Sequence, residues 1–276
     1  MPLVKAQCTN CGAALEVDDT KEAAVCPYCN TPYIVEKAIN NYTTNITNNI
    51  NAQVVNIINQ KEDYEIVAGT LVKYNGKSAD IVIPDEVIKI EKGAIPKSVK
   101  SIVFGNGITK IEESILYDCK ELVSVTIPNT VTSIGGYAFH GCDNLYIIRY
   151  QGTIKQWCEI FRIVELMNYG KTYKQLYING EEIAGELVIP NDVTKIGSNA
   201  FIGCTGLTKI EIPNSVTTIG FRAFVNCIGL ISITIPDSIT SIGDNAFGRC
   251  NNAIVYTNNP YAIKYCETNG IKHSSV

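Results

Sequence analysis

A repeat of 23 residues is the feature that most restricts the folds open to this chain. Pro190, Pro213 and Pro236 lie 23 residues apart, and Gly105 and Pro128 are separated by the same interval. Counted from the proline as position 1, each copy follows the pattern P-N/D-x-V/I-T-x-I-G-x-x-A-F-x-x-C-x-x-L-x-x-I-x-I. Self-similarity of this length is typical of a solenoid, in which each copy forms one coil that buries its apolar side only against neighbouring coils.

Stacked coils place equivalent side chains above one another, in rows that we call ladders. The apolar positions 4, 7 and 12 of the repeat predict three core ladders. These are Val193, Val216 and Ile239; Ile196, Ile219 and Ile242; and Phe201, Phe224 and Phe247.

The segment before each proline alternates apolar and polar residues, as in 207–212. This period and the β-branched residues favour a strand, so successive copies should pair as a parallel sheet. Glycine at position 8 predicts a tight turn with positive φ, and it occurs as Gly135, Gly197, Gly220 and Gly243.

Motifs such as IPNSVTTIGFRAFVNC and IPNDVTKIGSNAFIGCTGLTKIEIP resemble the BspA-type leucine-rich repeat family over residues 64–273. The resemblance implies a β-rich, right-handed solenoid of stacked 23-residue coils with a parallel sheet and short helical turns. It also implies that residues 64–276 form this domain, with an N-terminal cap at 64–83 and a C-terminal cap at 252–276. Members of this family are often adhesion proteins.

The interval from Pro128 to Pro190 is 62 residues, so we expect residues 151–189 to contain an insertion. Its motif YQGTIKQWCEI resembles a recurrent insertion of the same family. Thr153 should cap a helix, and Asn179-Gly180 predicts a hairpin turn. We expect one side of the helix to carry Ile154, Trp157, Ile160, Phe161 and Val164.

Two C-x-x-C pairs near the N-terminus predict a metal site. The pairs Cys8/Cys11 and Cys26/Cys29 are separated by 14 residues. Four thiolates match the closed tetrahedral shell of structural Zn²⁺, and the segment resembles a zinc ribbon over residues 1–37. Disulfides or uncharged dithiols are the alternatives. We expect the zinc to stabilise the fold, because so short a segment lacks a sufficient core.

The remaining cysteines indicate packing rather than chemistry. Five recur at position 15 of the repeat, and Cys158 and Cys266 stand apart; the five are Cys119, Cys142, Cys204, Cys227 and Cys250. His140 is close to Cys142 in sequence, but a buried ladder cysteine is inert. We therefore predict no enzyme and no catalytic or cofactor-binding residue. The alternative is an unrecognised site in the insertion that uses Trp157 and Cys158.

The charge balance disfavours nucleic acid as a partner. The net charge is -4 and the pI is about 5.3, which gives no positive field for phosphate. Residues 1–37 hold three lysines and five acids. Residues 38–63 are rich in asparagine, and an apolar stripe in 38–60 leaves open a linker, an oligomerising helix or β-association of identical chains.

These observations predict a non-enzymatic scaffold that binds a protein partner through the solenoid surface. The candidate contact row is Lys195, Thr218 and Ser241. A nucleic-acid-associated accessory protein that uses the zinc ribbon and a cell-surface adhesion protein are the alternatives. The sequence shows neither a secretory signal nor a membrane span, so we expect a cytoplasmic protein.

Overall fold

The computed structural model describes residues 3–7, 14–18, 23–25, 32–34 and 63–276. The chain divides into two compact units, Met1–Lys61 and Glu62–Val276. In the first unit, β1 (Leu3–Gln7) pairs antiparallel with β2 (Ala14–Asp18), and β3 (Ala23–Val25) pairs antiparallel with β4 (Pro32–Ile34). The predicted zinc ligands Cys8, Cys11, Cys26 and Cys29 and the predicted linker lie outside the described residues.

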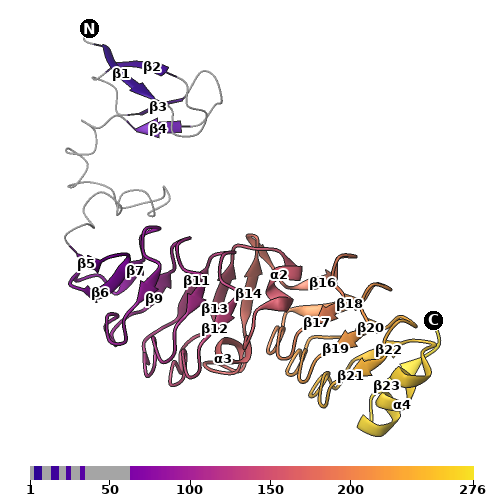
Figure 1. Ribbon diagram of the computed structural model, residues 1–276. Coiled ribbons are helices and arrows are strands. Elements are labelled where there is room, and N and C mark those ends of the chain that lie inside the picture. The colour runs from indigo at the N-terminus through magenta and orange to yellow at the C-terminus, as the bar shows by residue number, and fades with distance from the viewer. Residues whose placement is uncertain (1–2, 8–13, 19–22, 26–31, 35–62) are drawn as a thin grey trace. The chain divides into compact units, whose positions relative to one another are not determined.

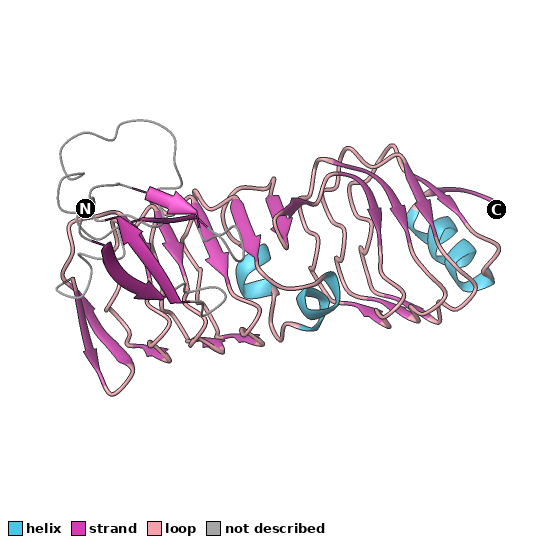
Figure 2. Cartoon of the chain, turned by 90° about the horizontal axis from the view of Figure 1, so that it is seen from above, coloured by secondary structure: helices cyan, strands magenta, loops and turns pink. Residues whose placement is uncertain are grey.

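The second unit is a solenoid whose coils place one strand each in a long parallel array (Figures 1 and 2). The array consists of two sheets. The first contains the parallel strands β7 (Asp80–Val82), β9 (Ser101–Val103), β11 (Ser124–Ile127), β13 (Ile147–Tyr150) and β14 (Gln175–Ile178), and ends in the antiparallel β15 (Glu181–Glu182). The second contains β16 (Gly185–Val188), β18 (Leu207–Glu211), β20 (Ser232–Thr234), β22 (Ile254–Tyr256) and β23 (Lys272–Ser274), all parallel.

Short strands form further sheets after the proline turns. They are β8 (Lys89–Ile90), β10 (Lys110–Ile111), β12 (Ser133–Ile134), β17 (Lys195–Ile196), β19 (Thr218–Ile219) and β21 (Ser241–Ile242). At the N-terminal end of this unit, β5 (Tyr64–Val67) and β6 (Thr70–Tyr74) form an antiparallel hairpin within the predicted cap, and β6 pairs in parallel with β8. The parallel sheets predicted from the alternating segments are confirmed.

The three predicted core ladders are confirmed. All nine side chains are buried. The ring centroids of Phe201 and Phe224 lie 5.2 Å apart and those of Phe224 and Phe247 lie 5.6 Å apart, with interplanar angles of 6° and 5°. The coils therefore share one elongated core in which equivalent residues contact each other, as the repeat pattern requires.

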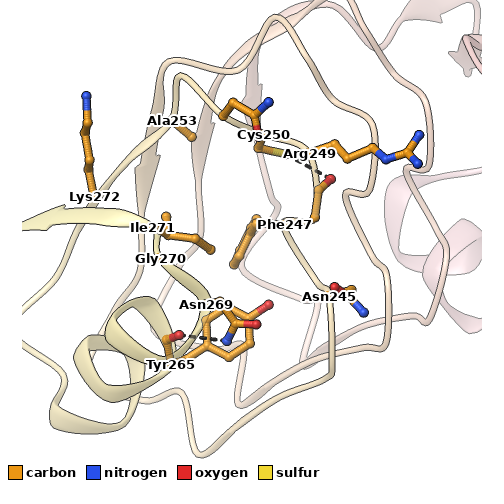
Figure 3. Close-up of a pocket in the computed structure, with 12 residues that line it drawn as sticks. Asn245, Phe247, Arg249, Cys250, Ala253, Tyr265, Asn269, Gly270, Ile271 and Lys272 are labelled. Carbon is orange, nitrogen blue, oxygen red and sulfur yellow. Dashed lines mark hydrogen bonds between the residues drawn. The ribbon is translucent and has the colours of Figure 1, made fainter.

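The C-terminal cap closes this core. Helix α4 (Pro260–Asn269) begins after Asn259, whose side chain accepts hydrogen bonds from the first turn. Tyr265 of this helix packs edge-on against Phe247, with ring centroids 6.2 Å apart. A hollow of about 240 Å³ remains between Phe247 and the end of α4 (Figure 3).

The position-15 cysteines are buried, as predicted. Burial raises the pKa of Cys142 and Cys204 to about 12. Three of the thiols donate to a carbonyl oxygen of the previous coil: Cys142 to Leu116 at 3.1 Å, Cys227 to Phe201 at 3.2 Å and Cys250 to Phe224 at 3.3 Å. These cysteines serve packing and join adjacent coils.

The prediction for glycine at position 8 is wrong. None of these four glycines has positive φ. A Cβ atom on Gly243 would lie 2.4 Å from the backbone nitrogen of Phe221, so glycine is required because the coils approach closely there. Positive φ occurs two residues later, at position 10, in Tyr137 (57°), Asn199 (63°), Arg222 (53°) and Asn245 (54°).

The expected insertion contains a longer coil of the solenoid. Helix α2 (Ile154–Glu159) begins after Thr153, whose side chain accepts a hydrogen bond from the Gln156 backbone at 3.2 Å, so the predicted cap is confirmed. After α3 (Val164–Met167), β14 pairs in register with β13. The predicted turn at Asn179-Gly180 joins β14 to β15 with φ values of 51° and 82°.

One residue of the predicted helix face is misplaced. Trp157 and Ile160 are buried, but the side chain of Phe161 is 68% exposed. The helix ends at Glu159, and Ile160 leaves the helical conformation with ψ of 118°. The helical period therefore no longer applies at Phe161.

Candidate protein-interaction site

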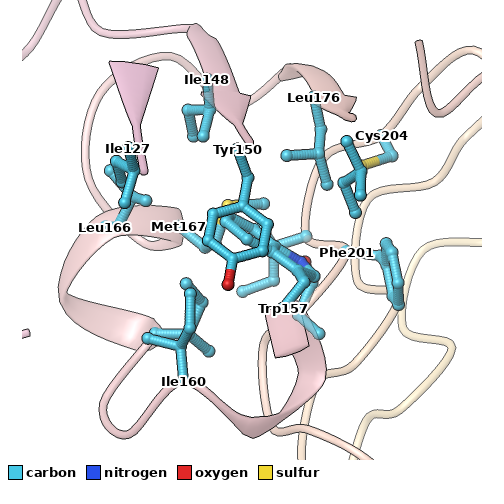
Figure 4. Packing of buried hydrophobic residues seen from close by; sticks show 14 of the residues in the cluster. Ile127, Ile148, Tyr150, Trp157, Ile160, Leu166, Met167, Leu176, Phe201 and Cys204 are labelled. Carbon is cyan, nitrogen blue, oxygen red and sulfur yellow. The ribbon is translucent and has the colours of Figure 1, made fainter. Parts of the chain in front are cut away.

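Two stacks of coils meet at a junction, where the main sheets separate between β15 and β16. Trp157, which lies beside Tyr150 in the core (Figure 4), crosses the junction by donating from Nε1 to the carbonyl oxygen of Ala200 at 2.8 Å. A second hydrogen bond crosses the junction from the backbone N–H of Lys174 to the carbonyl oxygen of Gly203, at 2.7 Å. The buried core therefore continues across the junction, although the array of main strands and the array of short strands are both interrupted there.

Lys174 is a buried cation at this junction. Its ammonium donates to the carbonyl oxygens of Lys171 at 2.5 Å, Tyr169 at 2.6 Å and Leu145 at 3.3 Å. Burial lowers its pKa to about 8. The side chain thus ties the loop after α3 to the preceding coil.

A groove of about 450 Å³ opens at the surface of the junction, between α2 and β17. We call it the junction groove. Ile163 and Val193 are buried residues of its lining, and Phe161 is the large exposed apolar residue there. Lys155, Glu159 and Lys195 add charged groups to the lining.

The backbone fixes Phe161 at the edge of the short-strand sheet. Its N–H donates to Thr132 at 2.9 Å, and its carbonyl oxygen accepts from Ile134 at 3.0 Å. Phe161 thereby pairs in parallel with Ser133. An apolar side chain on a fixed backbone loses little conformational entropy when a partner covers it.

The predicted contact row exists as a row in space. Lys195 pairs with Thr218, and Thr218 pairs with Ser241, in parallel register. Lys195 and Ser241 are exposed and Thr218 is half-buried. The row begins at the junction groove, which Lys195 also lines. Its role in binding stays a prediction.

Sequence reasoning missed Phe161 because its spacing fitted the buried side of a helix. Ile160-Phe161 follows the apolar period from Ile154 and Trp157. The one signal in the sequence is that the 23-residue pattern is interrupted between Pro128 and Pro190. In the structure, Phe161 pairs with Ser133, which is 28 residues earlier and not 23.

The residues of the enzymatic alternative pack in the core. Trp157 is fully buried, and burial raises the pKa of Cys158 to about 12, so its thiol stays protonated near neutral pH. His140 stacks on Tyr117 with ring centroids 5.1 Å apart, on a different corner from the groove. The described part of the chain holds no cluster of three or more His, Cys, Asp or Glu residues suited to a metal ion.

Comparison with known proteins identifies the family of the repeats. Residues 71–161 and 179–274 match the family model described as BspA type leucine rich repeat region, in 6 copies. None of the curated proteins matches. In the part of the chain that the structure describes, no helix has the length and apolar character needed to cross a membrane.

Three of the solved structures that resemble this chain are as follows. The chain is 26% identical to a leucine rich cell surface protein from Faecalibacterium prausnitzii A2-165, with a TM-score of 0.40, over 69% of this chain and 50% of that one. A leucine-rich repeat protein from Bacteroides ovatus ATCC 8483 is 23% identical, with a TM-score of 0.39, over 71% and 51%. A leucine-rich repeat protein from T. pallidum is 22% identical, with a TM-score of 0.34, over 74% and 89%. The chain spans about half the length of the first two proteins.

Proposed function

Because the chain belongs to the BspA-type leucine-rich repeat family, we propose that it is a non-enzymatic scaffold that binds a protein partner through the junction groove and the adjoining contact row. The observation that carries this proposal is Phe161. Its side chain is 68% exposed beside a groove of about 450 Å³, while its backbone is held by two hydrogen bonds.

The composition of the junction groove supports a protein partner. Protein interfaces concentrate binding energy in a few apolar or aromatic anchors surrounded by a polar rim. Phe161 supplies such an anchor, and Lys155, Glu159 and Lys195 supply a rim of both charges. The contact row continues this rim along the neighbouring coils.

An experiment on the full chain tests the proposal. Proteins captured from a lysate of the source organism are compared for the wild type, Phe161→Ser and Ile231→Ser. Ile231 is the matched control because it is an aliphatic residue 59% exposed on a coil away from the groove. We expect the partner to be retained by Ile231→Ser and reduced about tenfold by Phe161→Ser, the effect of losing one hot-spot residue.

Equal retention by both variants would show that the partner uses another surface. Thermal unfolding of each variant checks the fold, and neither substitution should shift the midpoint noticeably, because both side chains are exposed. Lys195→Glu extends the test to the contact row. Nucleic-acid association and surface adhesion stay alternatives, and cytoplasmic localisation stays a prediction.

We also propose a structural zinc site formed by Cys8, Cys11, Cys26 and Cys29. In sequence, the first pair falls between β1 and β2 and the second between β3 and β4, and both strand pairs are antiparallel. This order agrees with a ribbon in which each strand pair carries two ligands. When bound, zinc would link the two strand pairs and stabilise a unit too short for a large core.

A further inference from the structure

A second hollow, of about 340 Å³, lies where the turns after the short strands stack on the loop that follows α3. We call it the corner hollow. It shares no lining residue with the junction groove. Its polar lining side chains include three cations and three side-chain amides, and no aspartate or glutamate lines it; the six are Lys171, Arg222, Arg249, Asn168, Asn226 and Asn245.

The hollow arises from a change along one ladder. Position 13 of the earlier coils carries Tyr117 and His140, whose rings stack with centroids 5.1 Å apart. The same position of the later coils carries Ile202, Val225 and Gly248, all of which line the hollow. Because the ladder loses its aromatic rings there, the corner is left open to a ligand.

Two of the cations contact uncharged groups. The Arg222 guanidinium lies 5.0 Å from the ring centroid of Phe221. Nη1 of Arg249 lies 3.5 Å from Oδ1 of Asn226, and in Figure 3 the Arg249 side chain points away from the capping helix. Stacking and an amide contact orient a guanidinium without neutralising its charge.

These charges are uncompensated within the described chain. Lys171, Arg222 and Arg249 have no carboxylate within salt-bridge distance among the described residues, whereas Lys110 and Arg162 each have one and Lys209 has two. The whole chain has a net charge of -4. The corner hollow is thus a positively charged site on an acidic protein, and its electrostatic potential favours the binding of anionic groups.

We infer that the corner hollow binds an acidic peptide segment of the protein partner, with Arg222 and Arg249 each receiving a side-chain carboxylate and Lys171 adding a third positive charge. The inference rests on the proposed scaffold function. Guanidinium groups bind carboxylates through paired hydrogen bonds, and the two arginines come from adjacent coils, so they match a peptide that runs along the solenoid.

The test uses the full chain and a fluorescein-labelled hexa-aspartate peptide, with a hexa-asparagine peptide of the same length as the uncharged probe. Binding is measured by fluorescence anisotropy at two salt concentrations. We expect the wild type to bind the aspartate peptide. Arg222→Gln and Arg249→Gln should each lower the affinity for this peptide about fivefold. In both variants the affinity should also depend less steeply on salt concentration.

Arg149→Gln is the matched control. Arg149 is an exposed arginine that also stacks on an aromatic ring, 5.1 Å from the centroid of Tyr177, but it lies on the sheet face outside the corner hollow. We expect it to leave peptide affinity unchanged. An equal loss in Arg149→Gln, or equal binding of both peptides, would overturn the inference. Displacement of the peptide by equimolar inorganic phosphate would also overturn it, because one small anion would then satisfy the site.

The failure of this inference is distinguishable from failure of the proposed function. Phe161→Ser should keep the affinity for the aspartate peptide, because Phe161 does not line the corner hollow. If the partner is retained by Phe161→Ser and lost by Arg222→Gln, the junction groove is wrong and the corner hollow is supported. If the partner is lost only by Phe161→Ser, the corner hollow is not where it binds.

Discussion

Nε1 of Trp157 donates to the carbonyl oxygen of Ala200 at 2.8 Å, across the junction where both parallel sheets are interrupted. Trp157 comes from the irregular coil and Ala200 from the first regular coil after it. This buried hydrogen bond replaces part of the sheet pairing that the junction lacks. It makes Trp157 a structural link between the two stacks rather than part of a reactive site.

Trp157→Phe should lower the free energy of unfolding by about 1–3 kcal/mol, because the carbonyl oxygen of Ala200 loses a buried donor. Trp157→Ala should cost about 3–5 kcal/mol, since it also leaves a cavity. Urea unfolding measures both. Tyr173→Phe, at an exposed ring, is the control and should change little. A Trp157→Phe variant as stable as the wild type would contradict the linking role.

Phe224 lies between two rings of its ladder, so its removal should be costly. We expect Phe224→Ala to lower the free energy of unfolding by about 3–5 kcal/mol and Phe224→Leu by much less. Urea unfolding followed by circular dichroism measures the difference. Phe221→Ala is the control, because that ring is 43% exposed. Similar losses for Phe221→Ala and Phe224→Ala would argue against a shared stacked core.

Gly243 and Gly248 belong to the same coil but differ in how closely other atoms approach them, so the two substitutions test whether glycine is needed for packing between coils. Gly243→Ala would place Cβ 2.4 Å from the backbone nitrogen of Phe221, whereas the nearest atom to a Cβ on Gly248 lies 3.3 Å away. We expect Gly243→Ala to lower the midpoint of thermal unfolding and Gly248→Ala to leave it nearly unchanged. Neither glycine has positive φ, so backbone strain does not confuse the comparison. Equal midpoints for the two variants would refute the packing explanation.

The buried thiols predict that stability falls at alkaline pH. Burial raises the pKa of Cys142, Cys158 and Cys204 from 9.0 to about 12, so the unfolded chain releases these protons first. Each thiol should reduce the free energy of unfolding by about 1.4 kcal/mol per pH unit above about pH 9. Lys174 acts oppositely: its folded pKa of about 8 lies below 10.5, so it adds stability as pH rises between these values.

Between about pH 8 and pH 9 Lys174 acts alone, so the free energy of unfolding should rise slightly; above about pH 9 several thiols oppose this one lysine, and the free energy of unfolding should fall. Urea unfolding between pH 7 and pH 10.5 under reducing conditions measures it. A double Cys142→Ala, Cys204→Ala variant should show a shallower decline, because two groups with raised pKa are gone. An unchanged slope in this variant would mean that these thiols do not control the decline.

The proposed zinc site predicts a metal content near one atom per chain for protein purified without chelator. Elemental analysis of the full chain measures it, and Cys8→Ser with Cys26→Ser should abolish it because only two ligands remain. Cys158→Ser with Cys266→Ser is the control and should keep the metal, since both residues lie in the solenoid. A metal-free wild type would end the zinc proposal.

The repeat was predictable because each coil buries the same positions against its neighbours. The ladder of Phe201, Phe224 and Phe247, the cap at Thr153 and the turn at Asn179-Gly180 all follow from local spacing and residue type. The positive φ predicted for glycine at position 8 is wrong, because these glycines are set by the close approach of the preceding coil, as at Gly243, and that distance depends on the tertiary structure.

The spacing of apolar residues was enough to predict which side chains face the core and how often the coils recur, because both depend on a periodic pattern along the chain. The exposure of Phe161 beside a groove, and the hollow that Arg222 and Arg249 share, became visible only in the folded arrangement of the coils. The physical reason is that surface sites form where coils of unequal length or side-chain size are stacked. That juxtaposition depends on contacts between coils and is not encoded in the spacing within any one repeat.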